Sequence, residues 1–389
     1  MYMLTAAELL ARADAVVRAK LVQTAPRLAT SVYSSARNAF LAQLCAERPT
    51  LIAPPDQQAR TVWGLRFRSG LFNAAGMFKN GEGYELCLRQ GAGAYLAGTT
   101  TAHPRTGNHR RHERGFATTA RPFLPYPVSG AASNWLGLPN DGHAAVAKRL
   151  AGFERAEGLP IGASLMTAPE SSGVRALEEL VEGMWLYERA GVDFLEINES
   201  CPNVAHGSNS LEAIAERLGY LAQQFLARRT RRLPVIVKFS TDTALNDVPA
   251  LVDVLLTLKF DGVNFGNTST KYTQLRMTIA PNERSAFDAF TQTFGGGVSG
   301  LPLNTMSLEL VRHSAEYVGS KSLSHEFHVI RTGGIATASD LQASFGAGAA
   351  LCQWYTGYFE GFARYGHKLY AALYHELRNL SSAHTNVVL

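Results

Sequence analysis

The sequence predicts a (β/α)8 barrel, an α/β fold, preceded by an α-helical extension. Eight short apolar segments alternate with helix-like stretches over about 320 residues. The segments are almost continuously apolar, as expected of parallel strands buried on both faces. Glycines and polar residues follow their C-terminal ends, where barrel enzymes carry their sites. A doubly wound open sheet is the alternative, but it usually has fewer strands and a glycine-rich turn that we do not find in this sequence.

Composition excludes several classes of protein. The 389 residues are 46% hydrophobic and 18% charged, which is ordinary for a globular chain and unlike a disordered one. Four cysteines are too few for a disulfide scaffold of this length. We find no run of about 18 apolar residues that would predict a membrane span, and Glu8 and Asp14 argue against a secretory signal. The net charge of +5 fits an anionic ligand or a membrane surface. The basic residues are too dispersed to indicate a nucleic-acid partner.

Residues 1–55 are predicted to form the helical extension, and residues 56–389 the barrel. Apolar residues recur at helical spacing along residues 10–21, and acid–base pairs are expected between Glu8 and Arg12 and between Asp14 and Arg18. A second amphipathic helix is expected after Pro26. Six basic and three acidic residues give residues 1–50 a net charge of +3.

The barrel elements follow a proline-containing connector at residues 54–58. The eight predicted strands are residues 71–75, 94–99, 161–166, 193–197, 235–239, 262–266, 328–332 and 349–353. Helices are expected between them, including residues 176–190, 210–229 and 303–317.

Two glycine-rich segments indicate a phosphate site. Gly333 and Gly334 precede residues 336–340, and residues 296–300 (GGVSG) lie one segment earlier. Glycine lets backbone N–H groups approach a phosphate closely, and a following helix N-terminus adds a favourable dipole. Each motif alone could be an ordinary tight turn, but both fall in the region of a barrel that often binds phosphate.

Lys238 and Cys201 are the most informative single residues. Lys238 ends a very apolar segment, where it either extends to solvent or supplies a fixed cation to a ligand that becomes anionic. Cys201 lies in a polar loop, whereas Cys45, Cys87 and Cys352 lie in apolar patterns typical of core residues. A thiol of ordinary pKa, about 8.5, would make activity rise toward alkaline pH.

Taken together, residues 60–378 resemble the dihydroorotate dehydrogenases, which are FMN enzymes of pyrimidine biosynthesis. The motifs that carry the resemblance are, in order, residues 74–82 (AAGMFKNGE), 98–101 (GTTT), 107–108 (GN), 134–140 (NWLGLPN), 198–203 (NESCPN), Lys238, 267–268 (NT), 296–300 (GGVSG), 333–335 (GGI) and 355–357 (YTG).

The resemblance implies a role for each matching position. The implied FMN-binding residues are Ala74, Ala75, Gly76, Thr99, Lys238, Ser299, Gly300, Gly333, Gly334, Tyr355 and Thr356. The implied substrate-binding residues are Lys79, Asn134, Gly137, Leu138, Asn198, Asn203, Asn267 and Thr268. Lys79 would pair with the carboxylate of (S)-dihydroorotate. Cys201 would be the general base that removes the C5 proton as hydride leaves C6 for FMN, with Lys238 beside the flavin. No metal site is implied.

The match combines features of two classes within the family. The cysteine in NESCPN and the GLPN turn resemble the soluble class, which uses fumarate or, through a partner subunit, NAD. Lys79, the GTTT run and the helical extension resemble the membrane-associated quinone class, in which serine is the usual base. The basic tract at residues 109–114 departs from the family pattern and is read as a solvated loop. We find no iron–sulfur ligand cluster in the sequence, so NAD would require a second polypeptide.

These features imply a quinone or fumarate as electron acceptor and a cytoplasmic protein. Residues 1–50 would make peripheral contact with the cytoplasmic face of the inner membrane, although they also fit a dimerisation arm or a lid. Related soluble enzymes are dimers, so a homodimer is one expected assembly.

Two other functions fit part of the sequence. A related FMN enzyme could act on another dihydropyrimidine or a related ring; Trp135 favours this, whereas Lys79 would then lack a carboxylate partner. A non-catalytic flavin-binding barrel is disfavoured by the intact Cys201 loop.

Overall fold

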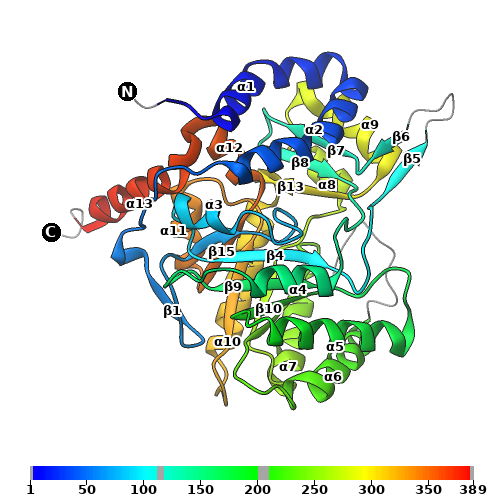
Figure 1. The fold of residues 1–389 in the computed structure, drawn as a ribbon, viewed down its shortest axis with the longest axis vertical. Coiled ribbons are helices and arrows are strands. Elements are labelled where there is room, and N and C mark those ends of the chain that lie inside the picture. The colour runs from blue at the N-terminus through cyan, green and yellow to red at the C-terminus, as the bar shows by residue number, and fades with distance from the viewer. Residues whose placement is uncertain (1–2, 112–117, 200–209, 386–389) are drawn as a thin grey trace.

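The computed structural model describes residues 3–111, 118–199 and 210–385, and its centre is a barrel of eight parallel strands (Figure 1). The strands are β3 (Leu71–Asn73), β4 (Tyr95–Thr100), β9 (Ile161–Leu165), β10 (Phe194–Asn198), β11 (Val235–Phe239), β12 (Gly262–Phe265), β14 (His328–Thr332) and β15 (Leu351–Trp354).

The strand order decides between the two folds considered from the sequence. From β4 to β15 each barrel strand pairs in parallel with the next barrel strand along the chain, and the last, β15, pairs in parallel with the first, β3. Strands β3 and β4 do not pair with each other; beyond the end of β3, an isolated bridge joins Phe78 to Ala97 of β4. The chain therefore forms a nearly closed barrel, which confirms the (β/α)8 prediction and excludes the open sheet.

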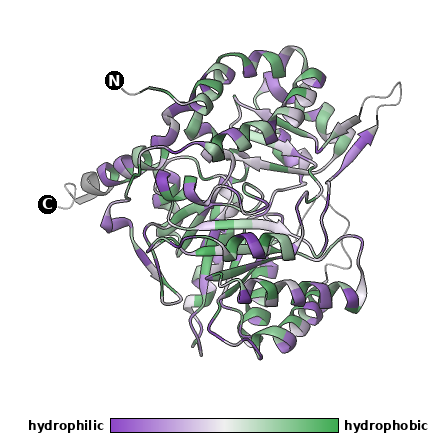
Figure 2. Cartoon of the chain, in the orientation of Figure 1, coloured by the Kyte–Doolittle hydropathy of each residue, from purple (hydrophilic) through white to green (hydrophobic). Residues whose placement is uncertain are grey.

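Helices cover the outside of the barrel. They are α3 (Tyr84–Gln90), α4 (His143–Ala151), α5 (Gly173–Arg189), α6 (Leu211–Leu221), α7 (Val248–Thr257), α10 (Asn304–Gly319), α11 (Ala338–Gly346), α12 (Thr356–Tyr365) and α13 (Leu369–Thr385). The helix expected at residues 210–229 is shorter, because α6 passes into a π-helical turn at Ala222–Leu226. Apolar residues concentrate on the strands and the helix faces against them (Figure 2).

An apolar plug closes the N-terminal end of the barrel. The hairpin of β1 (Arg60–Val62) and β2 (Leu65–Phe67) carries Trp63 and Phe67. These rings pack on inward-facing residues of the strands, including Phe194 and Ile236. Only the opposite end of the barrel is therefore left for a site.

A second, antiparallel sheet lies beside the C-terminal end. It contains β7 (Phe123–Tyr126), β8 (Ala131–Asn134) and β13 (Gly297–Gly300), and a hairpin of β5 (His109–Arg111) and β6 (Thr118–Ala120) projects near it. Helices α8 (Tyr272–Arg276) and α9 (Arg284–Phe294) belong to the same region. Residues 296–300 were expected to form a loop leading into a helix, but Gly297–Gly300 form strand β13, which precedes α10.

The two N-terminal helices, α1 (Ala6–Thr24) and α2 (Pro26–Ala46), pack over this small sheet and α12 (Figure 1). Val22 and Ala29 are fully buried there. The expected Asp14–Arg18 pair is wrong, because Arg18 binds Glu360 at 2.5 Å and Asp14 accepts a hydrogen bond from Tyr33. The charges of α1 thus attach the helix to the protein.

A buried histidine joins three elements near the barrel rim. His143, the first residue of α4, shares a hydrogen bond of 2.9 Å between Nδ1 and the Thr100 hydroxyl of β4, and Thr100 also contacts the Tyr187 hydroxyl of α5. Burial lowers the pKa of His143 to about 3. The ring is therefore neutral in the folded protein at physiological pH.

Because the pKa of His143 is lowered in the folded state, we expect the protein to lose stability in acid. An unfolded histidine has a pKa of about 6.5, so the folded state is favoured above that pH and loses this contribution as pH falls toward 3. Between pH 6.5 and 4.5 we expect wild type to lose roughly 2–3 kcal/mol more unfolding free energy than His143→Leu. Urea unfolding at each pH measures this, with the exposed His375→Leu as control. Equal pH slopes for wild type and His143→Leu would contradict the assignment.

Candidate active site

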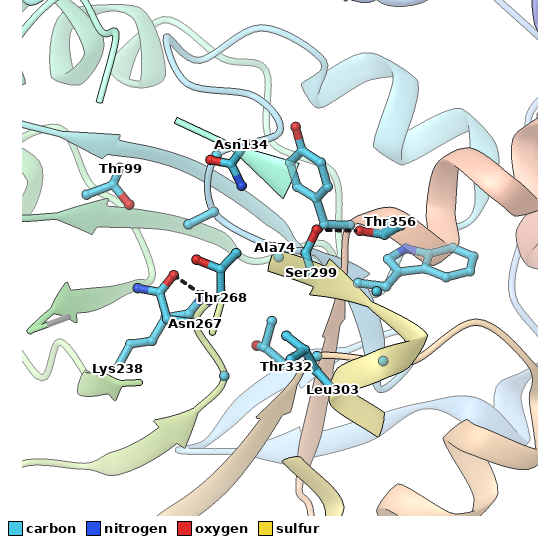
Figure 3. Close-up of a pocket in the computed structure, with 18 of the residues that line it drawn as sticks. Ala74, Thr99, Asn134, Lys238, Asn267, Thr268, Ser299, Leu303, Thr332 and Thr356 are labelled. Carbon is cyan, nitrogen blue, oxygen red and sulfur yellow. Dashed lines mark hydrogen bonds between the residues drawn. The ribbon is translucent and has the colours of Figure 1, made fainter. Parts of the chain in front are cut away.

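A cavity of about 980 Å³, counting the space at its mouth, opens at the C-terminal end of the barrel (Figure 3). Most of the residues singled out in the sequence line it. From the loop after β3 come Ala74, Ala75, Gly76 and Lys79; from the other strands and their loops come Thr99, Asn134, Leu138, Asn198, Lys238, Asn267, Thr268, Ser299, Gly300, Gly333, Gly334, Tyr355 and Thr356. Segments from along most of the barrel thus converge on one site.

The loop after β3 is held by two side chains that do not line the cavity. Asn73, fully buried, bonds both the N–H and the carbonyl of Leu96, so its amide replaces strand pairing between β3 and β4. The Glu82 carboxylate accepts hydrogen bonds from the backbone N–H groups of Lys79 and Asn80. This fixes the turn that places Lys79 at the cavity wall.

Amide and hydroxyl side chains form one wall of the cavity. The Asn267 amide donates to Asn198 Oδ1 at 3.0 Å. Its own Oδ1 accepts from the Thr268 N–H at 3.0 Å (Figure 3). The Asn134 amide donates to the Gly297 carbonyl. The buried Thr268 hydroxyl has no hydrogen-bond partner among the described residues. A buried polar atom left unpaired in a cavity indicates a ligand with complementary groups.

Lys238 lies at the base of the cavity and does not extend to solvent. The residue is 4% exposed, and its Nζ lies 3.4 Å from both Glu196 and Gln353. The sequence left two interpretations, a lysine that extends to solvent and a fixed cation that faces a ligand. This position agrees with the fixed cation.

The glycine-rich segments meet at the other end of the cavity. The hydroxyls of Ser299 and Thr356 are 2.9 Å apart (Figure 3). Gly334 has φ +76°, and a Cβ there would lie 2.3 Å from the Asn304 Cα, so only glycine fits this turn.

The helix whose N-terminus meets the cavity at this end is α12, and not α11 as expected from the sequence. The first turn of α11 is capped by its own residues, since Asp340 accepts from the N–H groups of Ala336 and Thr337. Helix α12 begins at Thr356, which lines the cavity, and has no side-chain cap. Its N–H groups are therefore the better placed to meet an anion.

Sequence reasoning missed several residues of the site. Phe123, Leu303 and Trp354 line the cavity. Arg37 of α2 donates to the Tyr355 hydroxyl at 2.7 Å and to the Gly76 carbonyl at 3.2 Å. Of these four residues, only Trp354 could have been predicted from the sequence, because it lies at the end of the last strand.

Three predicted residues are not placed in the cavity. Cys201 and Asn203 lie outside the described residues, although Asn198, which begins their motif, lines the cavity. Gly137 does not line it; its carbonyl accepts from Arg105, while Leu136 and Leu138 on either side do line it.

The structure confirms that the three cysteines predicted as core residues lie in the core or pack against it. Cys87 and Cys352 are buried, and burial raises the pKa of Cys352 and of the partly buried Cys45 to about 12. None of these thiols is therefore suited to act as a base near neutral pH.

The charge of the lining favours an anionic ligand. Among the described residues that line the cavity, Lys79 and Lys238 are cationic and none is a carboxylate. Residues 58–377 match the family model described as dihydroorotate dehydrogenase. The chain belongs to the dihydroorotate dehydrogenase family.

Curated relatives carry the name dihydroorotate dehydrogenase (quinone). One from a Cyanothece species is 31% identical over 318 residues, which cover 80% of this chain and 78% of the relative. One from Parvibaculum lavamentivorans is 32% identical, covering 79% and 80%. One from a Mycobacterium species is 30% identical, covering 84% and 83%.

Solved structures show the same fold. The dihydroorotate dehydrogenase of Eimeria tenella, in complex with ferulenol, superposes with a TM-score of 0.72 at 20% identity, covering 90% of this chain and 92% of that one. Its ligand-free form gives 0.72 at 21% identity, with coverage of 89% and 94%.

The family uses FMN, and the residues of this cavity fit that group. The glycine-rich end offers a turn that only glycine can occupy, two hydroxyls and an uncapped helix N-terminus, groups that suit a phosphate. The opposite end offers a cation and several amides. When bound, FMN accepts two electrons from a substrate and passes them to an acceptor.

Proposed function

We propose that this protein oxidises (S)-dihydroorotate to orotate in pyrimidine biosynthesis and passes the electrons through FMN to a quinone. The observation that carries the proposal is the cavity, which brings two lysines and a set of amides together at the C-terminal end of the barrel. A small anionic heterocycle is the ligand that such a lining recognises. The names of the relatives supply the reaction and the acceptor.

The residues divide into two groups by position. Ser299, Gly300, Gly333, Gly334, Tyr355 and Thr356 would hold the FMN phosphate, while Ala74, Ala75, Gly76, Thr99 and Lys238 would contact the flavin. Lys79 would bind the substrate carboxylate, and Asn134, Asn198, Asn203, Asn267 and Thr268 would bind the pyrimidine ring.

Cys201 is proposed as the general base. Its thiolate would take the C5 proton as the electrons leave C6, so that proton and electrons depart from adjacent carbons. The residue just before its loop, Glu199, is held at 2.8 Å by Arg217 of α6. This ion pair anchors the segment where it leaves β10.

The structure removes one argument for a different ring substrate. Trp135, which favoured that alternative, does not line the cavity and packs against Phe294 with ring centroids 6.3 Å apart. Its size therefore does not alter the substrate space.

Turnover with separate acceptors tests the function. With dihydroorotate as donor, we expect rapid reduction of a soluble quinone and little reduction of fumarate or NAD. If FMN-loaded protein reduces none of the three in the presence of dihydroorotate, the proposed reaction is wrong. Preferential reduction of fumarate would contradict the proposed quinone acceptor but not the oxidation of dihydroorotate.

We further propose that the N-terminal helices contact a membrane surface. Leu9, Leu10, Val16 and Val17 of α1 are 54–81% exposed, and Leu28 and Val32 of α2 are also exposed. No helix in the described part of the chain is long and apolar enough to span a bilayer. Exposed apolar residues beside basic ones are typical of a helix that lies in the interface. Arg37 places α2 next to Tyr355, so a quinone could reach the cavity from this side.

Charge substitution on α1 tests this contact. The double variant Leu10→Glu, Val17→Glu should bind anionic phospholipid vesicles about tenfold more weakly, because two apolar contacts are lost and negative charge is added. Turnover with a short-chain soluble quinone should not change. Val174→Glu, at an exposed apolar position on α5, is the control. Point variants are preferable to truncation, since α1 and α2 bury core residues such as Val22. Unchanged vesicle sedimentation would rule out this surface.

A further inference from the structure

A buried carboxylate lies beneath the cavity, and none of the roles above uses it. Glu196 is in the middle of β10 and has no exposed surface. Along this strand Phe194 packs into the apolar plug and Asn198 lines the cavity. Since alternate residues of a strand point to the same face, Glu196 occupies the layer between the plug and the cavity.

The carboxylate is held by residues of three other barrel strands, β11, β12 and β15. Its Oε2 accepts from the Gln353 amide at 2.7 Å and from the Asn264 amide at 3.1 Å. Its Oε1 lies 3.4 Å from Lys238 Nζ. A carboxylate without exposed surface is costly unless it is paired and hydrogen-bonded, and here it is both.

The amide of Gln353 contacts both Glu196 and Lys238. Its Nε2 donates to Glu196, while its Oε1 accepts from Thr332 at 2.9 Å and lies 3.4 Å from Lys238 Nζ. The donor and acceptor ends of Gln353 are therefore both fixed. Lys238 is left with little freedom to turn away from the base of the cavity.

This pairing changes what Lys238 does electrostatically. A lone cation beside the flavin would favour negative charge on its reduced form, whereas an ion pair exerts a much smaller field. We propose that Glu196 is a positioning residue that fixes Lys238 and offsets its charge, so that the midpoint potential of the bound flavin is lower than Lys238 alone would set. This inference rests on the proposed function, because it requires bound FMN.

Redox titration of the purified holoenzyme tests it. Glu196→Gln keeps the shape of the side chain and removes its charge. We expect it to favour the two-electron reduced flavin about tenfold, a rise of about 30 mV in midpoint potential. Glu196→Asp keeps the charge but moves it away from Lys238, so a smaller rise is expected. Glu188→Gln, which removes a buried carboxylate that neither lines the cavity nor contacts Lys238, should leave the potential unchanged.

The outcomes separate this inference from the proposed function. A lowered or unchanged potential in Glu196→Gln would overturn the inference, and so would a shift in Glu188→Gln as large as that in Glu196→Gln. If Glu196→Gln cannot be purified with bound flavin, Glu196→Asp provides the test. A higher midpoint potential than wild type supports the inference, and an unchanged or lower one overturns it. A wild-type protein that binds no FMN, or whose flavin dihydroorotate does not reduce, would contradict the proposed function instead.

Discussion

Replacing Cys201 by alanine is expected to lower kcat for dihydroorotate oxidation by about 10²–10⁴-fold, the usual contribution of a general base. FMN content should stay the same, because the residues assigned to FMN lie on other loops. Cys201→Ser should retain a reduced fraction of activity, since a hydroxyl can still accept the proton but forms its anion less readily. Steady-state rates normalised to bound flavin measure the effect.

The pH profile provides a second measurement for the same residue. A thiol with its ordinary pKa of about 8.5 is mostly protonated at neutral pH, so wild-type kcat should rise as pH increases toward that value. The rise should be absent from Cys201→Ala. Cys45→Ser is the matched control, because burial raises the pKa of that thiol to about 12. Full turnover in the alanine variant would show that another group is the base.

Replacing Lys79 by methionine is expected to reduce kcat/KM for dihydroorotate by about 100-fold or more, mostly through KM. Removing one partner of a desolvated charge pair leaves the other charge uncompensated, which typically costs 2–5 kcal/mol. Methionine keeps most of the length of the side chain, so the loop held by Glu82 should be preserved.

A substrate analogue makes this prediction specific. The carboxamide of dihydroorotate lacks the negative charge, so wild type should discriminate strongly against it and Lys79→Met should not. Lys148→Met, at an exposed position on α4, should behave as wild type toward both compounds. If Lys79→Met still strongly prefers the carboxylate, a different cation binds it.

Much of the barrel could be predicted because its strands carry a strong local signal. The predicted strands at residues 235–239 and 328–332 coincide with β11 and β14, and the other six differ by a few residues at their ends. The small sheet of β7, β8 and β13 was not predicted. Its strands are each four residues long, and β13 pairs with β8 across more than 160 positions, as Gly297 does with Asn134, so no local pattern marks that pairing.

The site could be predicted where motifs follow strand ends and not where side chains arrive from elsewhere. Arg37 reaches Tyr355 from a helix more than 300 positions away, which no local spacing reveals. Glu196 lies in an apolar strand, and only the barrel brings Lys238, Asn264 and Gln353 to it. On α1, helical spacing identified a row of apolar residues but not its direction, and Leu10 and Val17 point outward.

Anaerobic titration of the purified protein with dihydroorotate tests the central claim most directly. If the cavity holds FMN beside the substrate, the protein is yellow with about one FMN per chain, and about one equivalent of dihydroorotate bleaches its visible absorbance and yields orotate. A protein that cannot be loaded with FMN, or a bound flavin that stays oxidised in excess dihydroorotate, would contradict it.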